Sequence, residues 1–251
     1  MNQILQWLVT TDPSLNHHNA CELHEDHTGQ WLTKSPEYAN WKAGNTRFLW
    51  IHGIPGAGKT VLLSYIAEDI KIFCNNSPTG DLGWGYYYCY FARNQNETPW
   101  LLRWLISQLC RQIGGIPPVV TSMYKERGYP QVSRLVDVLA AVSENFSRVY
   151  IVIDALDKSA KREKLLAVLL QILENKTLGH IQLLVTSRKE LDIERALLAV
   201  AESLSLSNHY VDEDIRTYIK SRLQDDPKYY RWPNVLKAET ETALVKGAKG
   251  M

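Results

Sequence analysis

The chain has 251 residues, and its 28 basic and 27 acidic side chains give a formal net charge of +1. The net charge is therefore too small to attract nucleic acid or an anionic membrane to the protein as a whole, and we expect neither as a partner. The 45% hydrophobic fraction is ample for a buried core and excludes a disordered chain. The N-terminus lacks a basic segment followed by a long apolar run, and no stretch reaches membrane-spanning length, so the sequence predicts a soluble cytoplasmic protein.

Residues 1–45 form a polar and aromatic leader before the first apolar run. Within it, Cys21, His24 and His27 have the spacing C-x-x-H-x-x-H. Sulfur and imidazole suit zinc, but structural zinc sites usually pair two such ligand sets and this leader has one. We therefore favour a leader that packs its tryptophans on the next domain, and we keep the zinc site as the alternative.

From Arg47 onward, short apolar runs alternate with helix-length segments. This alternation is typical of a parallel sheet covered by helices on both faces, which is an α/β fold. The predicted strands are Phe48 to Ile51, Tyr86 to Phe91, Val149 to Ile153, Ile181 to Val185 and a weaker one at Leu204 to Leu206.

Directly after the first predicted strand, the chain reads Gly53-Ile54-Pro55-Gly56-Ala57-Gly58-Lys59-Thr60, which fits G-x-x-x-x-G-K-[ST] in full. Glycines allow backbone N–H groups to approach a phosphate chain, and the following helix contributes its positive end. Lys59 would reach the phosphate oxygens and the Thr60 hydroxyl would bind Mg²⁺. The candidate nucleotide-binding residues are Gly53, Pro55, Gly56, Ala57, Gly58, Lys59, Thr60 and Val61.

The aromatic run Tyr86 to Phe91 fits two readings. It could be a platform on which bases stack, but a strand buried on both faces explains it without a ligand, and we favour the strand. Thr98 and Pro99 then predict the N-cap and first residue of a helix that ends at Gly114.

Three further segments have helical periodicity. They are Leu62 to Phe73, Val132 to Val142 and Leu165 to Leu173. Beyond about residue 207 the pattern becomes helical throughout, with one helix around Asp212 to Leu223 and another from about Asn234. This end of the chain predicts a small C-terminal helical extension.

The third predicted strand ends in Asp154, as a Walker B element does. Its carboxylate would hold Mg²⁺ through water, opposite Thr60. Asp157 lies three residues further on, where it could orient an attacking water or act only as an acid at a helix start. The fourth strand leads into Thr186-Ser187-Arg188, and an arginine there could contact the γ-phosphate or simply face solvent.

Taken together, the glycine-rich loop, Asp154 with Asp157, and Thr186 to Arg188 resemble the NACHT division of the STAND P-loop NTPases. The nearest type is the nephrocystin-like N-terminal module of fungal NLR-like proteins, and the leader segment His27 to Leu32 resembles theirs as well. The resemblance implies three parts: a leader at 1–45, a nucleotide-binding domain at 46–207, and at 208–251 the truncated start of a helical or winged-helix region.

The resemblance also implies a switch operated by ATP, ADP and Mg²⁺. ADP would hold a closed form, and exchange for ATP would allow self-association and drive an attached effector. Related proteins carry their sensing repeats C-terminally, whereas this sequence has no internal period, so we expect it to be a fragment of a longer protein.

Lys158 departs from the family pattern, which commonly has a second acid at this position. A cation beside Asp157 would reduce its basicity, so we expect slow or absent ATP hydrolysis. Two interpretations remain open: a slow ATPase switch, and an interaction module that binds nucleotide without turnover. A small-molecule kinase agrees less well with the sequence, because no arginine-rich lid or acceptor pocket is evident in it.

Overall fold

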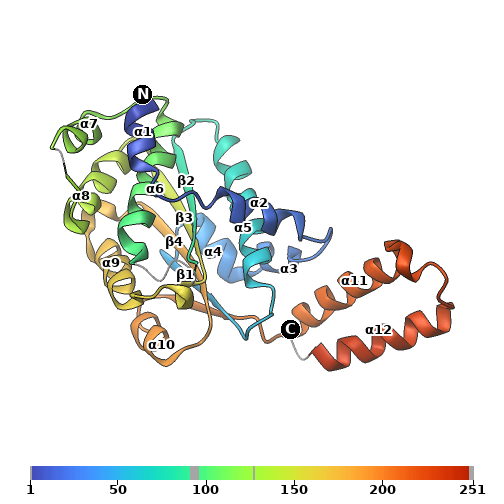
Figure 1. The fold of residues 1–251 in the computed structure, drawn as a ribbon. Coiled ribbons are helices and arrows are strands. Elements are labelled where there is room, and N and C mark those ends of the chain that lie inside the picture. Colours follow the sequence, from blue (N-terminus) through green and yellow to red (C-terminus); the bar gives the residue numbers. More distant parts are fainter. Residues whose placement is uncertain (1, 91–95, 127, 249–251) are drawn as a thin grey trace.

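The computed structural model describes residues 2–90, 96–126 and 128–248, and it is built around one five-stranded sheet (Figure 1). The strand order is β2-β3-β4-β1-β5, and every pairing is parallel. The strands are β1 (Phe48–His52), β2 (Leu82–Tyr88), β3 (Arg148–Asp154), β4 (Ile181–Ser187) and β5 (Glu202–Ser205). The predicted α/β fold with a parallel sheet is therefore confirmed.

The second strand begins earlier than predicted. It starts at Leu82 and ends at Tyr88, so the prediction of Tyr86 to Phe91 was wrong in its bounds, and Phe91 lies outside the described residues. Gly83 and Gly85 hid the strand from a pattern search, because glycine weakens a strand signal. Both are needed for packing: a Cβ on Gly83 would lie 2.9 Å from the Phe146 ring, and one on Gly85 would lie 2.8 Å from Leu105.

The aromatic side chains of this strand belong to the core. Tyr86, Tyr87 and Tyr88 are all buried, and they pack between the sheet and its helices. A buried ring offers no free face for a base, so for these three residues the strand reading is confirmed and the stacking platform is not. The fifth strand also differs slightly from the prediction, because it spans Glu202–Ser205.

Helices cover both faces of the sheet (Figure 1). On one side, α5 lies against β2, β3 and β4, with α2 and α4 beside it; on the other, α6 contacts β2, α8 and α9. The helices are α1 (Asn2–Leu8), α2 (Ser14–Glu22), α3 (Gln30–Thr33), α4 (Pro36–Ala43), α5 (Lys59–Asn75), α6 (Glu97–Ile113), α7 (Pro118–Lys125), α8 (Val132–Ser143), α9 (Arg162–Glu174), α10 (Leu191–Leu197), α11 (His209–Asp225) and α12 (Asn234–Ala248), with short 3-10 turns at Leu156–Lys158, Lys176–Leu178 and Pro227–Tyr229.

Two helix starts differ from the sequence prediction. Helix α6 is capped by Asn96, whose side chain accepts the Thr98 N–H at 3.2 Å, so the predicted Thr98 cap was wrong. Helix α11 is capped by Asn208, which accepts the Val211 N–H at 3.1 Å. In both cases asparagine is a strong cap and lies just before the residues that the prediction used. The predicted end of α6 is confirmed, because Gly114 adopts the left-handed conformation there.

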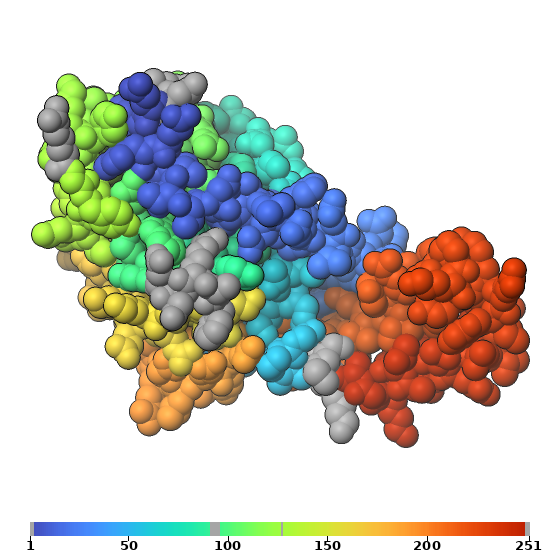
Figure 2. All heavy atoms as spheres, in the orientation of Figure 1, coloured from blue at the N-terminus to red at the C-terminus, as the bar shows by residue number. Residues whose placement is uncertain are grey.

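The leader lies along the body of the molecule rather than apart from it (Figure 2). Trp41 is fully buried and packs against Tyr38 and Tyr150 of β3. The buried Arg103 of α6 donates to the carbonyls of Trp7 and Leu8, and so holds the end of α1. These contacts join the leader to both faces of the sheet.

Helices α11 and α12 lie side by side and extend from the body as an arm (Figures 1 and 2). Side chains of α11 reach back to the leader, whereas no described residue of α12 is buried. No helix within the described ranges is both long and apolar enough to span a bilayer.

Candidate functional site

The glycine-rich loop joins β1 to α5 and forms an open turn at the carboxyl edge of the sheet. Gly56 and Gly58 have φ values of 82° and 74°, which other residues rarely adopt. A Cβ on Gly58 would have no protein atom within 4 Å, so the space beside this backbone is open. The Gly53 N–H donates to the Ser187 carbonyl at 3.3 Å and fixes the start of the loop to the end of β4.

Lys59 is the first residue of α5, and its ammonium folds back over the loop. Its Nζ donates to the carbonyls of Gly53 at 2.8 Å and Ile54 at 2.7 Å. Burial lowers the pKa of Lys59 below its usual value, and the carboxylates of Asp157 and Asp154 oppose that shift. The cation therefore lies at the loop with partners that an anionic ligand could replace.

Thr60 and Asp154 meet although 94 residues separate them. The Thr60 hydroxyl donates to one Asp154 oxygen at 2.8 Å, and the Thr186 hydroxyl donates to the other at 2.5 Å. Asp154 is 2% exposed, and burial raises its pKa, while the two hydroxyl groups and the charge of Lys158 oppose that shift. Three adjacent segments thus place oxygen ligands around one buried carboxyl group.

The residue after Asp154 has an unusual backbone. Ala155 has φ 57°, the left-handed region that a residue with a Cβ rarely occupies. Its N–H donates to the Thr186 hydroxyl at 3.0 Å, so this turn is held by the same threonine that contacts Asp154. Strain of this kind is characteristic of functional sites, since the surrounding structure must maintain it.

Asp157 and Arg188 contact each other directly. One Asp157 oxygen accepts the Arg188 backbone N–H at 2.9 Å, and the other lies 3.2 Å from the Arg188 Nε. The Asp157 side chain is 5% exposed and that of Arg188 is 50% exposed. In this conformation the guanidinium is therefore held beside the carboxylate at the end of β4.

Lys158 ends the 3-10 turn after β3 and is partly exposed. Its charge acts on Asp154 and Lys59, although burial is the larger influence on the pKa of both groups. The cation paired with the Asp157 carboxylate is Arg188, for which the sequence left contact with the γ-phosphate and exposure to solvent as the two alternatives.

A cavity of about 670 Å³ opens beside the loop. Its walls come from three parts of the chain: the loop with the start of α5, the leader, and helices α11 and α12. The lining includes Gly56, Ala57, Gly58, Val61, Leu62, His24, Thr28, Trp31, Leu206, Asp214, Ile215, Tyr218 and Leu244. One end is backbone and polar, and most of the wall is apolar or aromatic, as in many small-molecule binding sites.

Asp214 joins two walls of this cavity. Its Oδ2 accepts the Gly29 N–H at 2.8 Å and the Trp31 Nε1–H at 2.9 Å. Burial raises the pKa of Asp214, and these two hydrogen bonds oppose that shift. Sequence reasoning missed this residue, because no local pattern relates α11 to a leader more than 180 residues away.

Most candidate residues from the sequence lie around this one place. Gly56, Ala57, Gly58 and Val61 line the cavity, while Gly53, Lys59, Thr60 and Asp154 lie at the loop and beneath it. Pro55 is exposed on the loop and is not part of the lining.

The proposed C-x-x-H-x-x-H set is not brought together. His24 interacts through Nε2 with the Thr28 carbonyl at 3.1 Å and stacks on Tyr65, while Cys21 Sγ lies 3.6 Å from His17 Nε2. His27 lines a different hollow, together with Lys34 and Glu37. The zinc alternative with those three ligands is therefore wrong.

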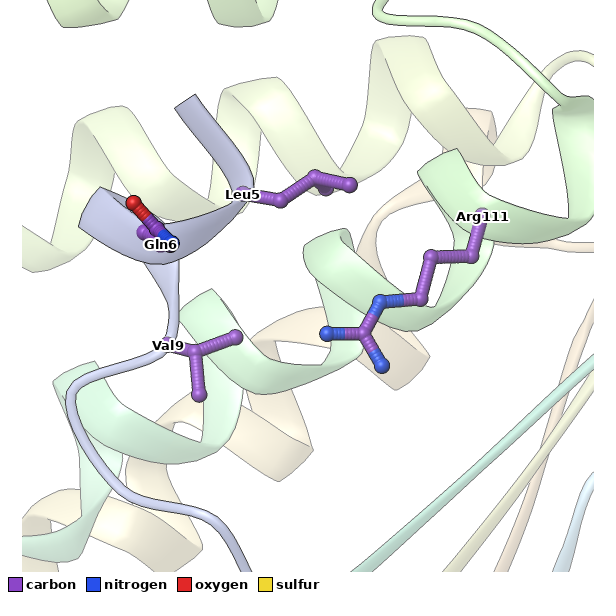
Figure 3. A pocket seen from close by; sticks show the side chains of 4 residues that line it. All are labelled: Leu5, Gln6, Val9 and Arg111. Atoms are coloured by element: carbon purple, nitrogen blue, oxygen red, sulfur yellow. The ribbon is translucent and has the colours of Figure 1, made fainter. Parts of the chain in front are cut away.

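A second hollow of about 410 Å³ lies between α1 and α6, where Arg111 extends toward Leu5, Gln6 and Val9 (Figure 3). None of these residues belongs to the glycine-rich loop or to a strand end. We therefore take the cavity beside the loop as the candidate functional site.

The sheet order and the loop between β1 and α5 define an α/β P-loop NTPase fold. Two solved structures have the same fold: the Orc1 protein of Aeropyrum pernix in complex with DNA, with a TM-score of 0.50 and 13% identity, and Cdc6p from Pyrobaculum aerophilum, with a TM-score of 0.51 and 16% identity. The match covers 87% and 84% of this chain, respectively, and 53% of each of those chains.

Residues 27–188 match the family described as nephrocystin 3, N-terminal, and the chain belongs to this family. It is also 28% identical over 206 residues to the vegetative incompatibility protein HET-E-1 of Podospora anserina. That match covers 78% of this chain but 15% of the relative. The resemblance to the nephrocystin-like NACHT type of P-loop NTPase is therefore confirmed.

The residues present fit a magnesium ion. Mg²⁺ prefers oxygen ligands, usually one or two protein groups together with water and phosphate. The Thr60 hydroxyl and the Asp154 carboxylate already lie 2.8 Å apart at the edge of the loop. They are the groups that would hold the ion.

Proposed function

We propose that the chain binds ATP and ADP with Mg²⁺ in the cavity beside the glycine-rich loop. The observation that carries this proposal is the composition of the cavity wall, which joins the loop to an apolar surface from Leu62, Leu206 and Tyr218. The loop would receive the phosphates, and the apolar end would receive the base.

Each loop residue then has a definite task. The Lys59 ammonium would exchange its bonds to the Gly53 and Ile54 carbonyls for bonds to phosphate oxygens. Thr60 and Asp154 would hold Mg²⁺, which neutralises phosphate charge when bound. Arg188 would contact the γ-phosphate after leaving Asp157, so ATP and ADP would differ in what they offer this residue.

We further propose that nucleotide operates a conformational switch. The cavity is lined by the leader, the loop and the C-terminal helices, so a bound nucleotide would contact all three segments at once. A ligand shifts a conformational equilibrium only through different affinities for the two forms. Among the described residues of α11 and α12, only Val211 and Leu223 are buried, so few contacts oppose movement of this arm. ATP would favour a form that self-associates and acts on an effector or repeat domain outside this chain.

Hydrolysis would be slow or absent in the isolated chain. The Arg188 backbone N–H donates to one Asp157 oxygen at 2.9 Å, and this contact remains when the guanidinium turns to the γ-phosphate, so the carboxylate is less free to orient an attacking water. The same contact favours a second candidate function, a module that binds nucleotide and a protein partner without turnover. The division at 1–45, 46–207 and 208–251 and a cytoplasmic location belong to this proposal as well.

The test begins with the nucleotide that the purified chain carries. Mass spectrometry of the denatured protein should detect adenine nucleotide, and calorimetry on the stripped protein should detect Mg²⁺-dependent binding of ATP and ADP. GTP and GDP serve as the comparison. Preferential binding of guanine nucleotide would correct the base, and no binding of any nucleotide at millimolar concentration would overturn the proposal.

A further inference from the structure

A cluster of three side chains lies between the leader and the helix that follows the glycine-rich loop. His17 and Cys21 come from successive turns of α2, and Glu68 comes from α5. One ligand atom from each lies within 4.8 Å of the other two. None of its three members lines the cavity beside the glycine-rich loop.

The distances within the cluster suit a metal ion. His17 Nε2 lies 3.6 Å from Cys21 Sγ and 2.9 Å from Glu68 Oε1. Two ligands of a tetrahedral zinc ion, with bonds of about 2.3 Å to sulfur and 2.0 Å to nitrogen, are themselves about 3.6 Å apart. The imidazole and thiol are therefore already at the spacing that a shared ion requires, and the Glu68 oxygen, 2.9 Å from the imidazole nitrogen, lies within 4.8 Å of the thiol sulfur.

The surroundings of His17 orient its ring for this role. Its Nδ1 lies 2.9 Å from the buried Tyr88 hydroxyl, and its ring stacks on Tyr86 with centroids 4.4 Å apart. When Nδ1–H donates to that hydroxyl, the lone pair is on Nε2, which faces Cys21 and Glu68. Metal-binding histidines almost always have such a partner on the second nitrogen, because it fixes the tautomer and the ring.

We propose that His17, Cys21 and Glu68 bind a zinc-class divalent cation. Cys21 and Glu68 are both partly exposed, so water can supply the fourth ligand. The Cys21 thiol would release its proton to solvent on binding. Lys71 donates to both Glu68 oxygens, at 3.1 and 3.0 Å, and would remain on the oxygen that does not contact the ion.

The ion would join α2 of the leader to α5. A bound metal would therefore hold the leader on the helix whose first residues form part of the nucleotide site. The site does not depend on the proposed nucleotide function, because none of its ligands belongs to that machinery.

The experiment uses the full chain, stripped with a chelator and kept reduced, without nucleotide. Titration with Zn²⁺ alone should give one equivalent bound, and Co²⁺ should give a thiolate charge-transfer band that Cys21→Ser abolishes. His17→Gln and Glu68→Gln should weaken Zn²⁺ by more than the roughly 10- to 100-fold expected when Tyr88→Phe removes the partner of the imidazole. The matched controls are His18→Gln, His24→Gln and His27→Gln, which should leave affinity unchanged.

Circular dichroism tests whether each variant is folded. If His17→Gln unfolds, the partly exposed Glu68→Gln and Cys21→Ser decide the question. The absence of stoichiometric Zn²⁺ binding to the wild type would overturn the proposal and leave the cluster as a hydrogen-bonded contact. Binding that survives His17→Gln and Glu68→Gln but is lost with His24→Gln would also overturn it, because the ion would then have other ligands.

Discussion

Arg188 contacts Asp157 twice, through its backbone N–H at 2.9 Å and through its Nε at 3.2 Å. Arg188 directly follows β4, and Asp157 lies in the 3-10 turn after β3. A cation that pairs with a carboxylate in one state and with a phosphate in another can report which nucleotide is present. The guanidinium is half exposed and can turn toward a ligand, whereas the nearly buried Asp157 carboxylate would keep the Arg188 backbone N–H as a partner.

We expect Lys59→Ala to abolish nucleotide binding. The substitution removes the ammonium from the loop and leaves the phosphate charge uncompensated. Calorimetry with Mg²⁺ and ATP measures the effect. Lys71→Ala is the control, because it removes a lysine from the same helix away from the loop. Equal ATP affinity for the wild type and Lys59→Ala would contradict the prediction.

Arg188→Ala should weaken ATP by about 10- to 150-fold and ADP far less. A charge-assisted hydrogen bond to the γ-phosphate is worth about 1.5 to 3 kcal/mol, and ADP lacks that group. The measurement is the ratio of the two dissociation constants. Lys189→Ala removes the neighbouring exposed cation and should leave the ratio unchanged. A ratio that does not move in Arg188→Ala would leave the guanidinium as a partner of Asp157 only and would contradict the phosphate contact.

We expect Lys158→Glu to increase single-turnover ATP hydrolysis above a slow wild-type rate. The change introduces the acid that the family resemblance implies at this position and removes a positive charge that acts on Asp154. Asp154→Asn should lose Mg²⁺-dependent turnover.

Lys161→Glu is the matched control for Lys158→Glu, since it makes the same change of charge at an exposed position nearby. If the wild type already turns over at a rate typical of an ATPase, at least about 1 per second, and Lys158→Glu has no effect, the proposed role of Lys158 is wrong.

Asp214→Ala should destabilise the contact between α11 and the leader. The Gly29 and Trp31 N–H groups would lose their common acceptor, and a hydrogen bond to a charged group makes a net contribution of about 1.5 to 3 kcal/mol. The melting temperature and the affinity for ATP should both decrease. Asp212→Ala is the control. It removes an exposed acid of the same helix, just before Asp214, and should have little effect on either measurement.

The pH dependence of stability should also change at Asp214. Burial raises the pKa of this carboxyl group above 3.8, so the folded chain holds the proton to higher pH than the unfolded chain does. The contribution of Asp214 to stability therefore falls as pH rises from about 3.8 through the folded-state pKa. Asp214→Asn cannot titrate, so the difference between its stability and that of the wild type should vary in this window and be constant above it.

Local patterns in the sequence were enough to predict the P-loop fold and most residues of the candidate site. The loop from Gly53 to Thr60, the strand that ends at Asp154 and the strand that leads to Arg188 are local patterns, and parallel strands bring their carboxyl ends to one edge whatever their order. The position of β4 between β1 and β3 could be read only from the folded chain, and it places Thr186 against Asp154 and Arg188 against Asp157.

The tertiary structure also decided what surrounds that edge. Asp214 meets Trp31 across 183 positions of the chain, and His17 meets Glu68 across 51. No spacing in the sequence encodes either contact, because each depends on how whole helices pack once the core forms. Short-range periodicity fixes the elements and the residues at their ends, whereas the partners of a side chain on a helix surface are fixed only by packing.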